Sequence, residues 1–444
     1  MSYSKYRTVY GEVQKERFNE MDITQSSSEG SLMAVNTNFL AVSWNSTGGG
    51  VAIFKADKPC RCPVHVPLVR GHKSYVVDVK FSPFRSDLLM TASDDSTVKL
   101  WEIPEDGITE DMTNELQQYL GHGRKVAFAN FNPVCSDIIA SASFDNTLHI
   151  WNMLKSELIT KVSLKEYPTS MEWNYNGSLV ACASKDKNLY VVDPRKGEII
   201  VKTKGHESPK TMKMTWISEY NFISTGFDKG NTREMKLWDI RKVDNNLAIE
   251  NPAQTVVIDH QSSIPTPYFD YDLKLLFVFG RGEGNMHYYD INDGTIKPCS
   301  DYMSSEPTTA IVMFDKKTMD YNKCELDRFA KYTGKNIVYL SFYYPKKVPE
   351  FDDSLYPKTF SGESALSLDD WVSGNNAEPV VKDIREIENK WISTPQTFEK
   401  KVEEKKPIST CPQCIQYEKT IEELNEKIQE LEKENKMLKE KLGE

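Results

Sequence analysis

The chain has 444 residues, of which 39% are hydrophobic, and its formal net charge is −10 at pH 7. This length exceeds a single compact core, so we expect a large fold with appended segments. The acidic balance argues against a general nucleic-acid-binding protein. The opening residues lack the apolar core of a secretory signal, and no apolar run reaches the ~20 residues of a membrane span. We therefore expect a cytoplasmic protein whose eight cysteines are reduced thiols.

The N-terminal region is polar, and one short strand is predicted in it, over residues 6–10. The run FLAVSWNSTGGGVAIF, which begins at Phe39, then has two alternating apolar segments around a turn from Asn45 to Gly50. This pattern is typical of a β-hairpin and is the first unit of the predicted β-sheet fold.

A longer repeat begins with a Gly-His pair. A strand-like run follows, then a Ser-Pro turn, a second strand, a tight turn that holds Asp95, and a third strand that ends at Trp101. Trp101 follows His72 by 29 positions (101 − 72), and Trp151 follows His122 by the same interval (151 − 122). Gly-His and Trp ends that recur at a period of ~40–50 residues are typical of the blades of a WD-repeat β-propeller.

The repeated His, Asp and Trp residues have a structural explanation. A buried imidazole, a hydroxyl, the turn carboxylate and the indole N–H can satisfy one another as a chain of hydrogen bonds that pins the loop to its sheet. This interpretation disfavours a catalytic role. The positions with this predicted structural role are His72, Asp95, Trp101, His122, Asp145, Trp151, His206, Asp228, Trp238 and His260.

Weaker repeats extend the pattern. The fourth, fifth and sixth units are predicted at residues 164–193, 205–239 and 259–290, and further strands at 301–304, 309–314, 325–332 and 336–344 make a seventh. A propeller leaves strand edges unpaired unless its ring closes, and the strand at residues 6–10 is the candidate that completes the last blade. The sequence thus predicts an all-β, seven-bladed WD-repeat β-propeller over residues 1–345.

Beyond the propeller the composition changes twice. Residues 346–380 combine Pro and Gly with isolated aromatic residues, which favours an extended arm packed on the propeller over a free linker. Residues 381–410 are polar and charged, and they are predicted to form a flexible linker.

The last segment, residues 411–444, has an apolar heptad repeat and is predicted to be an α-helical coiled coil. Lys427 and Glu432 carry opposite charges that pair between chains only when the helices are parallel and in register. A single amphipathic helix lying on the propeller is the alternative. The predicted core positions are Ile421, Leu424, Ile428, Leu431, Asn435, Leu438 and Leu442.

Segments outside the WD signature point to one family. They read SKYRTVYGE at residues 4–12, NKCELDRFAKY at 322–332 and LYPKTFSGESALSLDDW at 355–371. With these segments the chain resembles the coronin family along nearly its whole length. The resemblance implies binding and crosslinking of filamentous actin at the cell cortex, and contact with the actin-related complex that nucleates branches. It also implies self-association through the coil.

Two positions depart from the family pattern. Lys427 stands where the family's trimer motif has Arg, and it lacks the bidentate fork of Arg, so both a parallel trimer and a dimer remain open. Asp22 stands where several members have a surface Arg implicated in filament contact. That contact is therefore not transferred to this chain.

Contact with an acidic actin filament requires local basic patches on this acidic chain. The candidate residues are Lys5, Arg7, Arg70, Lys73, Arg124, Lys125, Arg233 and Lys236. A phosphoinositide is a further candidate partner, although the paired-Arg motif of lipid-binding propellers is replaced by Arg-Gly-Glu-Gly at residues 281–284. The alternative function is a generic WD-repeat adaptor. No phosphate loop, HExxH motif or nucleophile elbow is present, so we expect neither an enzyme nor a cofactor.

Overall fold

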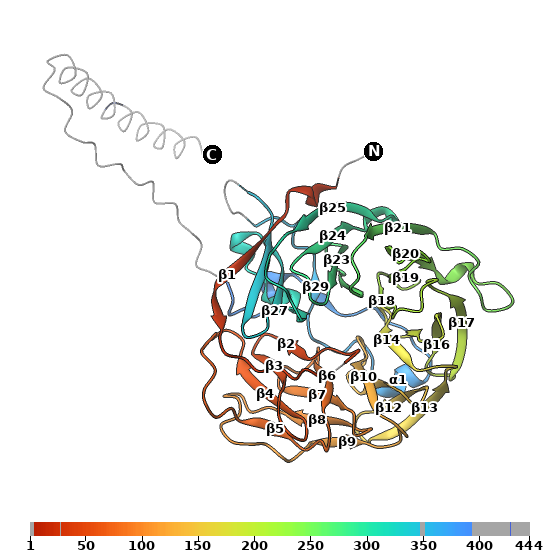
Figure 1. Cartoon of the computed structure of the whole chain (residues 1–444), viewed down its shortest axis with the longest axis horizontal. Coiled ribbons are helices and arrows are strands. Elements are labelled where there is room, and N and C mark those ends of the chain that lie inside the picture. Colours follow the sequence, from red (N-terminus) through yellow and green to blue (C-terminus); the bar gives the residue numbers. More distant parts are fainter. Residues whose placement is uncertain (1–3, 27, 347–350, 393–426, 428–444) are drawn as a thin grey trace, which may run out of the picture. The chain divides into compact units, whose positions relative to one another are not determined.

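The computed structural model describes residues 4–26, 28–346, 351–392 and 427. Within these residues, seven four-stranded antiparallel sheets are arranged around a central axis (Figure 1), which confirms the predicted all-β seven-bladed propeller. The chain separates into two compact units, residues 1–394 and 395–444. The coiled coil predicted at 411–444 lies outside the described residues, apart from Lys427.

The blades follow one another along the chain, and each is numbered here from its innermost strand outward. Blades 1 to 3 are β2 (Met33–Val35), β3 (Phe39–Trp44), β4 (Gly50–Lys55) and β5 (Leu68–Arg70); β6 (Val76–Phe81), β7 (Leu88–Ser93), β8 (Val98–Glu102) and β9 (Gln117–Tyr119); and β10 (Val126–Phe131), β11 (Ile138–Ser143), β12 (Thr147–Asn152) and β13 (Glu157–Ser163). Blades 4 and 5 are β14 (Pro168–Trp173), β15 (Val180–Ser184), β16 (Asn188–Asp193) and β17 (Glu198–Lys204); and β18 (Lys213–Trp216), β19 (Asn221–Phe227), β20 (Arg233–Asp239) and β21 (Gln254–Asp259). Blades 6 and 7 are β22 (Pro265–Asp270), β23 (Leu275–Gly280), β24 (Met286–Asp290) and β25 (Lys297–Tyr302); and β26 (Ala310–Met313), β27 (Glu325–Tyr332), β28 (Ile337–Tyr343) and β1 (Tyr10–Phe18).

The core lies between neighbouring blades. β7 and β11 are buried along their whole length, and their sequences, LLMTAS and IIASAS, contain apolar and small residues only. Such runs are expected in strands covered on both faces. The outermost strands β13 and β17 are largely exposed and carry polar residues.

The last blade is closed by a strand from the N-terminus, but not by the residues predicted. Residues 5–8 form a 3-10 helix capped by Ser4, and the strand that pairs with β28 is β1. Its register runs from Tyr10 opposite Tyr343 to Phe18 opposite Ile337, with a bulge between Val13 and Arg17. Because β1 is an outermost strand with most of its residues exposed, it lacks the apolar alternation that sequence reading depends on.

One strand assigned to the seventh blade belongs to the sixth. Residues 301–302 end β25, which pairs with β24, so the predicted strand at 301–304 is wrong as a member of blade 7. The other three predicted runs correspond to β26, β27 and β28. The sequence reading counted four strands in this region and therefore needed no outer strand from elsewhere, whereas β1 in fact occupies that place.

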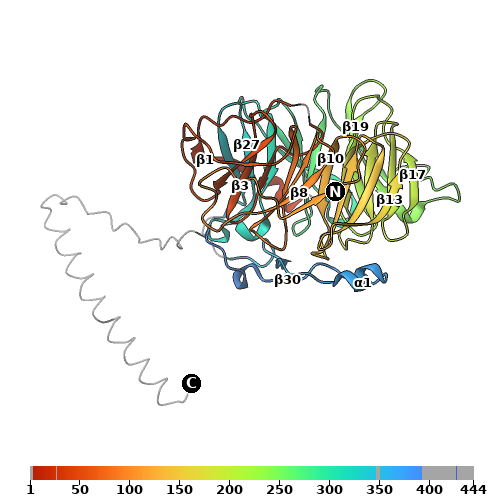
Figure 2. The same cartoon turned by 90° about the horizontal axis from the view of Figure 1, so that it is seen from below.

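Residues 351–392, called the C-terminal segment below, lie along one face of the propeller (Figure 2). The segment contains β29 (Thr359–Phe360), α1 (Leu368–Val372) and β30 (Val381–Lys382), and β29 pairs with β30. Trp371 is fully buried, and its indole N–H donates to the Gly177 carbonyl at 2.8 Å. The linker predicted from residue 381 is wrong for residues 381–392, since Ile384 is buried and Trp391 packs edge-on against Phe314.

The expected chain of hydrogen bonds is found in blades 2 and 3. In blade 2, His72 Nδ1 lies 2.9 Å from Asp95 Oδ2 and His72 Nε2 lies 2.7 Å from Thr91 Oγ1. The Trp101 indole donates to the same hydroxyl at 2.9 Å. Blade 3 repeats the arrangement with His122, Asp145, Ser141 and Trp151.

Electrostatics fit the blade 3 chain. Burial lowers the pKa of His122, so its imidazole is neutral at pH 7. Burial raises the pKa of Asp145, but hydrogen bonds from Thr147 and the Gly123 N–H, with His122 beside it, bring that pKa down to about 2. The carboxylate therefore stays ionised as an acceptor, and the chain fixes the Gly-His turn to the sheet.

Two predicted members of these chains are wrong. In blade 5, His206 Nδ1 contacts Glu234 at 2.9 Å, not Asp228, which accepts from the backbone N–H of Thr232 instead. The additional turn residues move Asp228 away, and the longer Glu side chain reaches the imidazole from the strand. In blade 6, His260 is exposed, and the carboxylate before it, Asp259, contacts His287.

The hydroxyl at the centre of the chain provides a test. Thr91→Val keeps the shape of the side chain but leaves the Trp101 N–H and His72 Nε2 without their common partner. We expect the free energy of unfolding to fall by about 1–3 kcal/mol, because buried polar groups lose their hydrogen bonds. Urea denaturation measures this effect. Thr113→Val, at an exposed threonine, is the matched control and should stay within about 0.5 kcal/mol of wild type; equal effects of the two substitutions would contradict the assignment.

Candidate functional site

One face of the propeller is formed by the Gly-His turns together with the hairpin turns at residues 94–96 and 144–146; it is called the Gly-His face below. The innermost strands start from this face and end at the opposite one. The C-terminal segment contacts that opposite end, where Phe360 packs against Phe84 and the Val134 carbonyl accepts from the Leu366 N–H at 3.0 Å. The Gly-His face is thus the one that the C-terminal segment leaves uncovered (Figure 2).

Three of the predicted contact residues lie on the Gly-His face, on the adjacent blades 2 and 3. Lys73 and Arg124 are exposed, and Lys125 is half-buried with its ammonium 4.2 Å from the centre of the Phe144 ring. The backbone is fixed next to these side chains, because the Lys73 N–H donates to Asp95 Oδ2 at 2.8 Å. The turns therefore hold exposed cationic side chains on a rigid backbone.

The structure removes Arg233 from the predicted surface. Its side chain is 1% exposed and forms ion pairs with Asp259 and Glu283. Lys236 is engaged in a similar way, with its ammonium 3.0 Å from the Gly205 carbonyl and 3.1 Å from a Glu234 oxygen. Both residues stabilise blade 5 and its junction with blade 6. They were selected from charge alone, which does not reveal burial.

The other three candidates are separate from this group. Arg70 is half-exposed and paired with Asp111 at 2.7 Å. Lys5 donates to the Ser354 carbonyl at 2.8 Å and so lies beside the C-terminal segment, with the exposed Arg7 two residues further on. The structure therefore groups Lys73, Arg124 and Lys125, and it does not bring all eight candidates together.

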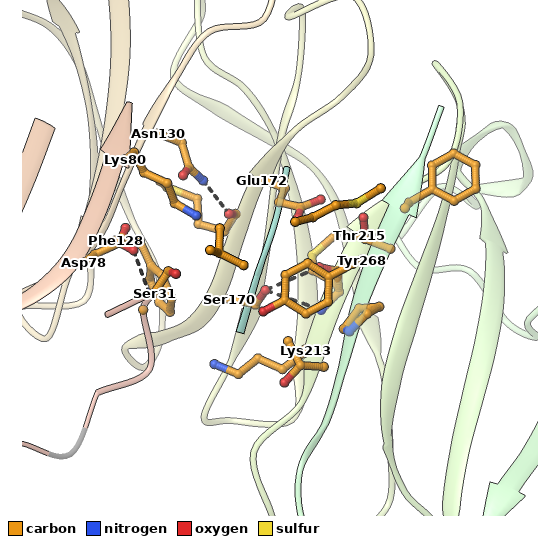
Figure 3. Close-up of a pocket in the computed structure, with 18 of the residues that line it drawn as sticks. Ser31, Asp78, Lys80, Phe128, Asn130, Ser170, Glu172, Lys213, Thr215 and Tyr268 are labelled. Atoms are coloured by element: carbon orange, nitrogen blue, oxygen red, sulfur yellow. Dashed lines mark hydrogen bonds between the residues drawn. The ribbon is translucent and has the colours of Figure 1, made fainter. Parts of the chain in front are cut away.

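A cavity of about 750 Å³ runs along the central axis (Figure 3). Its polar residues tie neighbouring blades together. Asp78 accepts the N–H groups of Ser31 at 2.8 Å and Ala129 at 2.9 Å, which joins blade 2 to the turn before blade 1 and to blade 3. The Asn130 amide donates to the Met171 carbonyl at 2.7 Å, from blade 3 to blade 4.

Glu172 is the carboxyl group in this cavity that most resembles a catalytic residue. Burial raises its pKa to about 7, and perturbed values of this kind occur at functional sites. Its described contacts are structural, however, since a carboxyl oxygen accepts the Trp216 N–H at 3.2 Å from the next blade. Lys213 bridges in the same way to Glu29 and to the Thr169 carbonyl, both at 2.8 Å. Sequence periodicity gives no signal for these channel residues.

Two further searches concern the described residues only. Among them, no group of three or more His, Cys, Asp or Glu side chains is placed to hold a metal ion. Nor does any helix within that part of the chain have the length and apolar character needed to cross a membrane. Cys60 and Cys62 are unpaired thiols, and burial raises the pKa of both.

Comparison with family models agrees with the observed repeats. The family "WD domain, G-beta repeat" matches residues 62–102, 113–152 and 161–193, and a type of WD40 repeat matches residues 337–379. A domain of unknown function matches residues 1–61. These matches cover blades 2, 3 and 4 and the closing region of the ring.

Similar proteins identify the family. Coronin-A of Dictyostelium discoideum is 33% identical over 96% of this chain and 93% of its own length, and coronin-2A of Bos taurus is 32% identical over 86% and 74%. The crystal structure of the WD40 domain of Toxoplasma gondii coronin superposes with a TM-score of 0.81 at 31% identity, covering 85% of this chain and 97% of that one. The chain therefore belongs to the coronin family.

Proposed function

We propose that this protein binds actin filaments through the Gly-His face and crosslinks them as an oligomer joined through residues 411–444. The observation that carries the proposal is the similarity to coronin-A over nearly the full length of both chains. It extends the family's actin-binding activity to a chain whose described ionisable cluster in the central cavity serves structure. On this proposal the protein is a binding protein of the cell cortex and not an enzyme.

The arrangement of charge supports the choice of face. Actin filaments are acidic, and Lys73 and Arg124 carry positive charge on exposed turns of neighbouring blades. The opposite face is occupied by the C-terminal segment, whose buried Trp371 and Trp391 contacts leave less of the propeller available there. Contact with the branch-nucleating actin-related complex would then fall to the C-terminal region, as the family resemblance implies.

Charge reversal on the Gly-His face tests the proposed contact. Lys73→Glu with Arg124→Glu should weaken filament binding about tenfold, because two exposed attractive contacts become repulsive. Raising the salt concentration should weaken wild-type binding in the same direction, since exposed charges are screened. High-speed cosedimentation with actin filaments measures both effects.

The matched control carries the same change of charge elsewhere. Lys155→Glu with Lys196→Glu alters two exposed lysines in turns at the opposite end of blades 3 and 4. It should cosediment as wild type does, with unchanged thermal unfolding. If both double variants bind filaments as wild type does, the proposed face is wrong.

The predicted coil supplies the crosslinking. A single propeller contact should be weak, whereas chains joined at 411–444 meet a second filament site at high effective concentration, which raises avidity by ~10²–10⁴. Leu424→Pro with Leu431→Pro breaks the predicted helix, so we expect a monomer that binds weakly and no longer bundles filaments. Sedimentation equilibrium should show a trimer or a dimer for wild type.

Low-speed cosedimentation reports bundling in the same samples. Glu423→Ala with Glu430→Ala, at outward heptad positions, is the control and should oligomerise and bundle as wild type does. A proline variant that stays oligomeric, or that bundles as well as wild type, would contradict the proposal. A protein that never binds filaments but keeps its oligomeric state would instead favour the WD-repeat adaptor function.

A further inference from the structure

A second cleft, of about 410 Å³, lies at the outer edge of the propeller, between β1 and the connection from β4 to β5. β1 is the outermost strand of blade 7 (Figure 1), so the cleft sits where the ring closes onto blade 1. It is called the basic cleft below. The charged side chains that line it are Lys15, Glu16, Arg17, Lys58 and Arg61.

The backbone around the basic cleft is fixed. The Asn19 N–H donates to the Cys60 carbonyl at 3.1 Å, and the Cys62 N–H donates back to the Asn19 carbonyl at 2.9 Å. The bulge in β1 between Val13 and Arg17 interrupts pairing with β28 just where the cleft is lined. The cationic side chains thus project from two chain segments that are joined by hydrogen bonds.

The charge of the basic cleft opposes that of the whole protein. Lys15, Arg17 and Lys58 are exposed, and within the described residues none of their side chains has a hydrogen-bond or ion-pair partner. Arg61 is held in place by Glu20, through two hydrogen bonds of 2.8 Å. Glu16 is the one carboxylate among the described residues that line the cleft. On a chain of net charge −10, this is a local concentration of positive charge.

The same connection carries an unusually exposed apolar side chain. Val64 is 96% exposed, three positions after Arg61 and next to the exposed His65. An apolar side chain beside cationic ones is the combination that peripheral proteins use at the boundary between headgroups and acyl chains. A free phosphate compound would use the cations but not Val64, which favours a membrane surface as the source of the ligand.

We propose that the basic cleft binds the multiply phosphorylated headgroup of an anionic membrane lipid, with Val64 entering the interface. Lysine ammonium groups and an arginine guanidinium suit phosphate oxygens, which accept several charge-assisted hydrogen bonds at once. This site is separate from the Gly-His face. The protein can therefore hold a membrane and a filament at the same time.

Flotation of the full-length chain with vesicles tests the proposal. The vesicles contain phosphatidylcholine alone, phosphatidylcholine with phosphatidylserine, or phosphatidylcholine with phosphatidylinositol 4,5-bisphosphate at the same total charge. We expect binding to the bisphosphate vesicles to be the strongest. Each basic residue near an anionic surface contributes about fivefold in affinity, so Arg17→Gln with Lys58→Gln should weaken binding about 25-fold.

Three further comparisons sharpen the test. Lys155→Gln with Lys196→Gln, which removes the same charge elsewhere, should bind these vesicles as wild type does. Val64→Ser should weaken vesicle binding severalfold while leaving binding of soluble inositol hexakisphosphate unchanged, since only the membrane contact uses the apolar side chain. Filament cosedimentation of the Arg17 and Lys58 double variant should equal that of wild type.

The proposal is overturned by any of four results: bisphosphate vesicles bound no better than phosphatidylserine vesicles of equal charge; the double variant floating as wild type does; binding of soluble inositol hexakisphosphate without binding of vesicles; or loss of filament binding in the double variant with vesicle binding retained. The last result would make the basic cleft part of the filament surface. Failure of filament binding in wild type would overturn the proposed function alone.

Discussion

The pairing of β1 with β28 is the interaction on which the rest of the structure depends. It joins residues 10–18 to residues 337–343 and so closes a ring through nearly the whole propeller. Without it, blade 7 would expose an unpaired strand edge, which is a site of aggregation. Closing a long loop costs little more than closing a short one, because the entropic cost grows only logarithmically with length. The buried Phe18, packed against Phe54 of blade 1, stabilises this closure.

Ring closure also separates the surface into regions with different work to do. Polar ties such as Asp78 and Asn130 hold blade to blade around the central cavity, where an unpaired group would be costly. The chains of hydrogen bonds through His72 and His122 hold the turns of the Gly-His face, which carry Lys73 and Arg124. The C-terminal segment covers the other face, and the seam beside β1 forms the basic cleft. Each proposed contact thus rests on backbone that the ring makes rigid.

The sequence predicted the fold well because the WD signature records buried contacts. Every Gly-His, turn Asp and Trp of blades 2 and 3 is a member of one hydrogen-bonded chain, so their spacing follows directly from blade geometry. Prediction failed where contacts are made by residues without a period. Glu234 replaces Asp228 because an insertion alters the turn, β1 has no apolar alternation, and Trp391 lies in a segment whose average composition is polar. The burial of Arg233 was invisible for the same reason: charge gives no information on which carboxylates lie nearby.

The central structural claim is that β1 is an integral strand of the closed ring, and native-state hydrogen exchange of the full-length protein measures this most directly. The account predicts that the amides of β1 paired with β28 exchange as slowly as those of β27 and β28, because they open only when the whole propeller unfolds. Fast exchange along β1 with slow exchange in β27 and β28 would contradict it, since the ring would then be stable without its N-terminal strand.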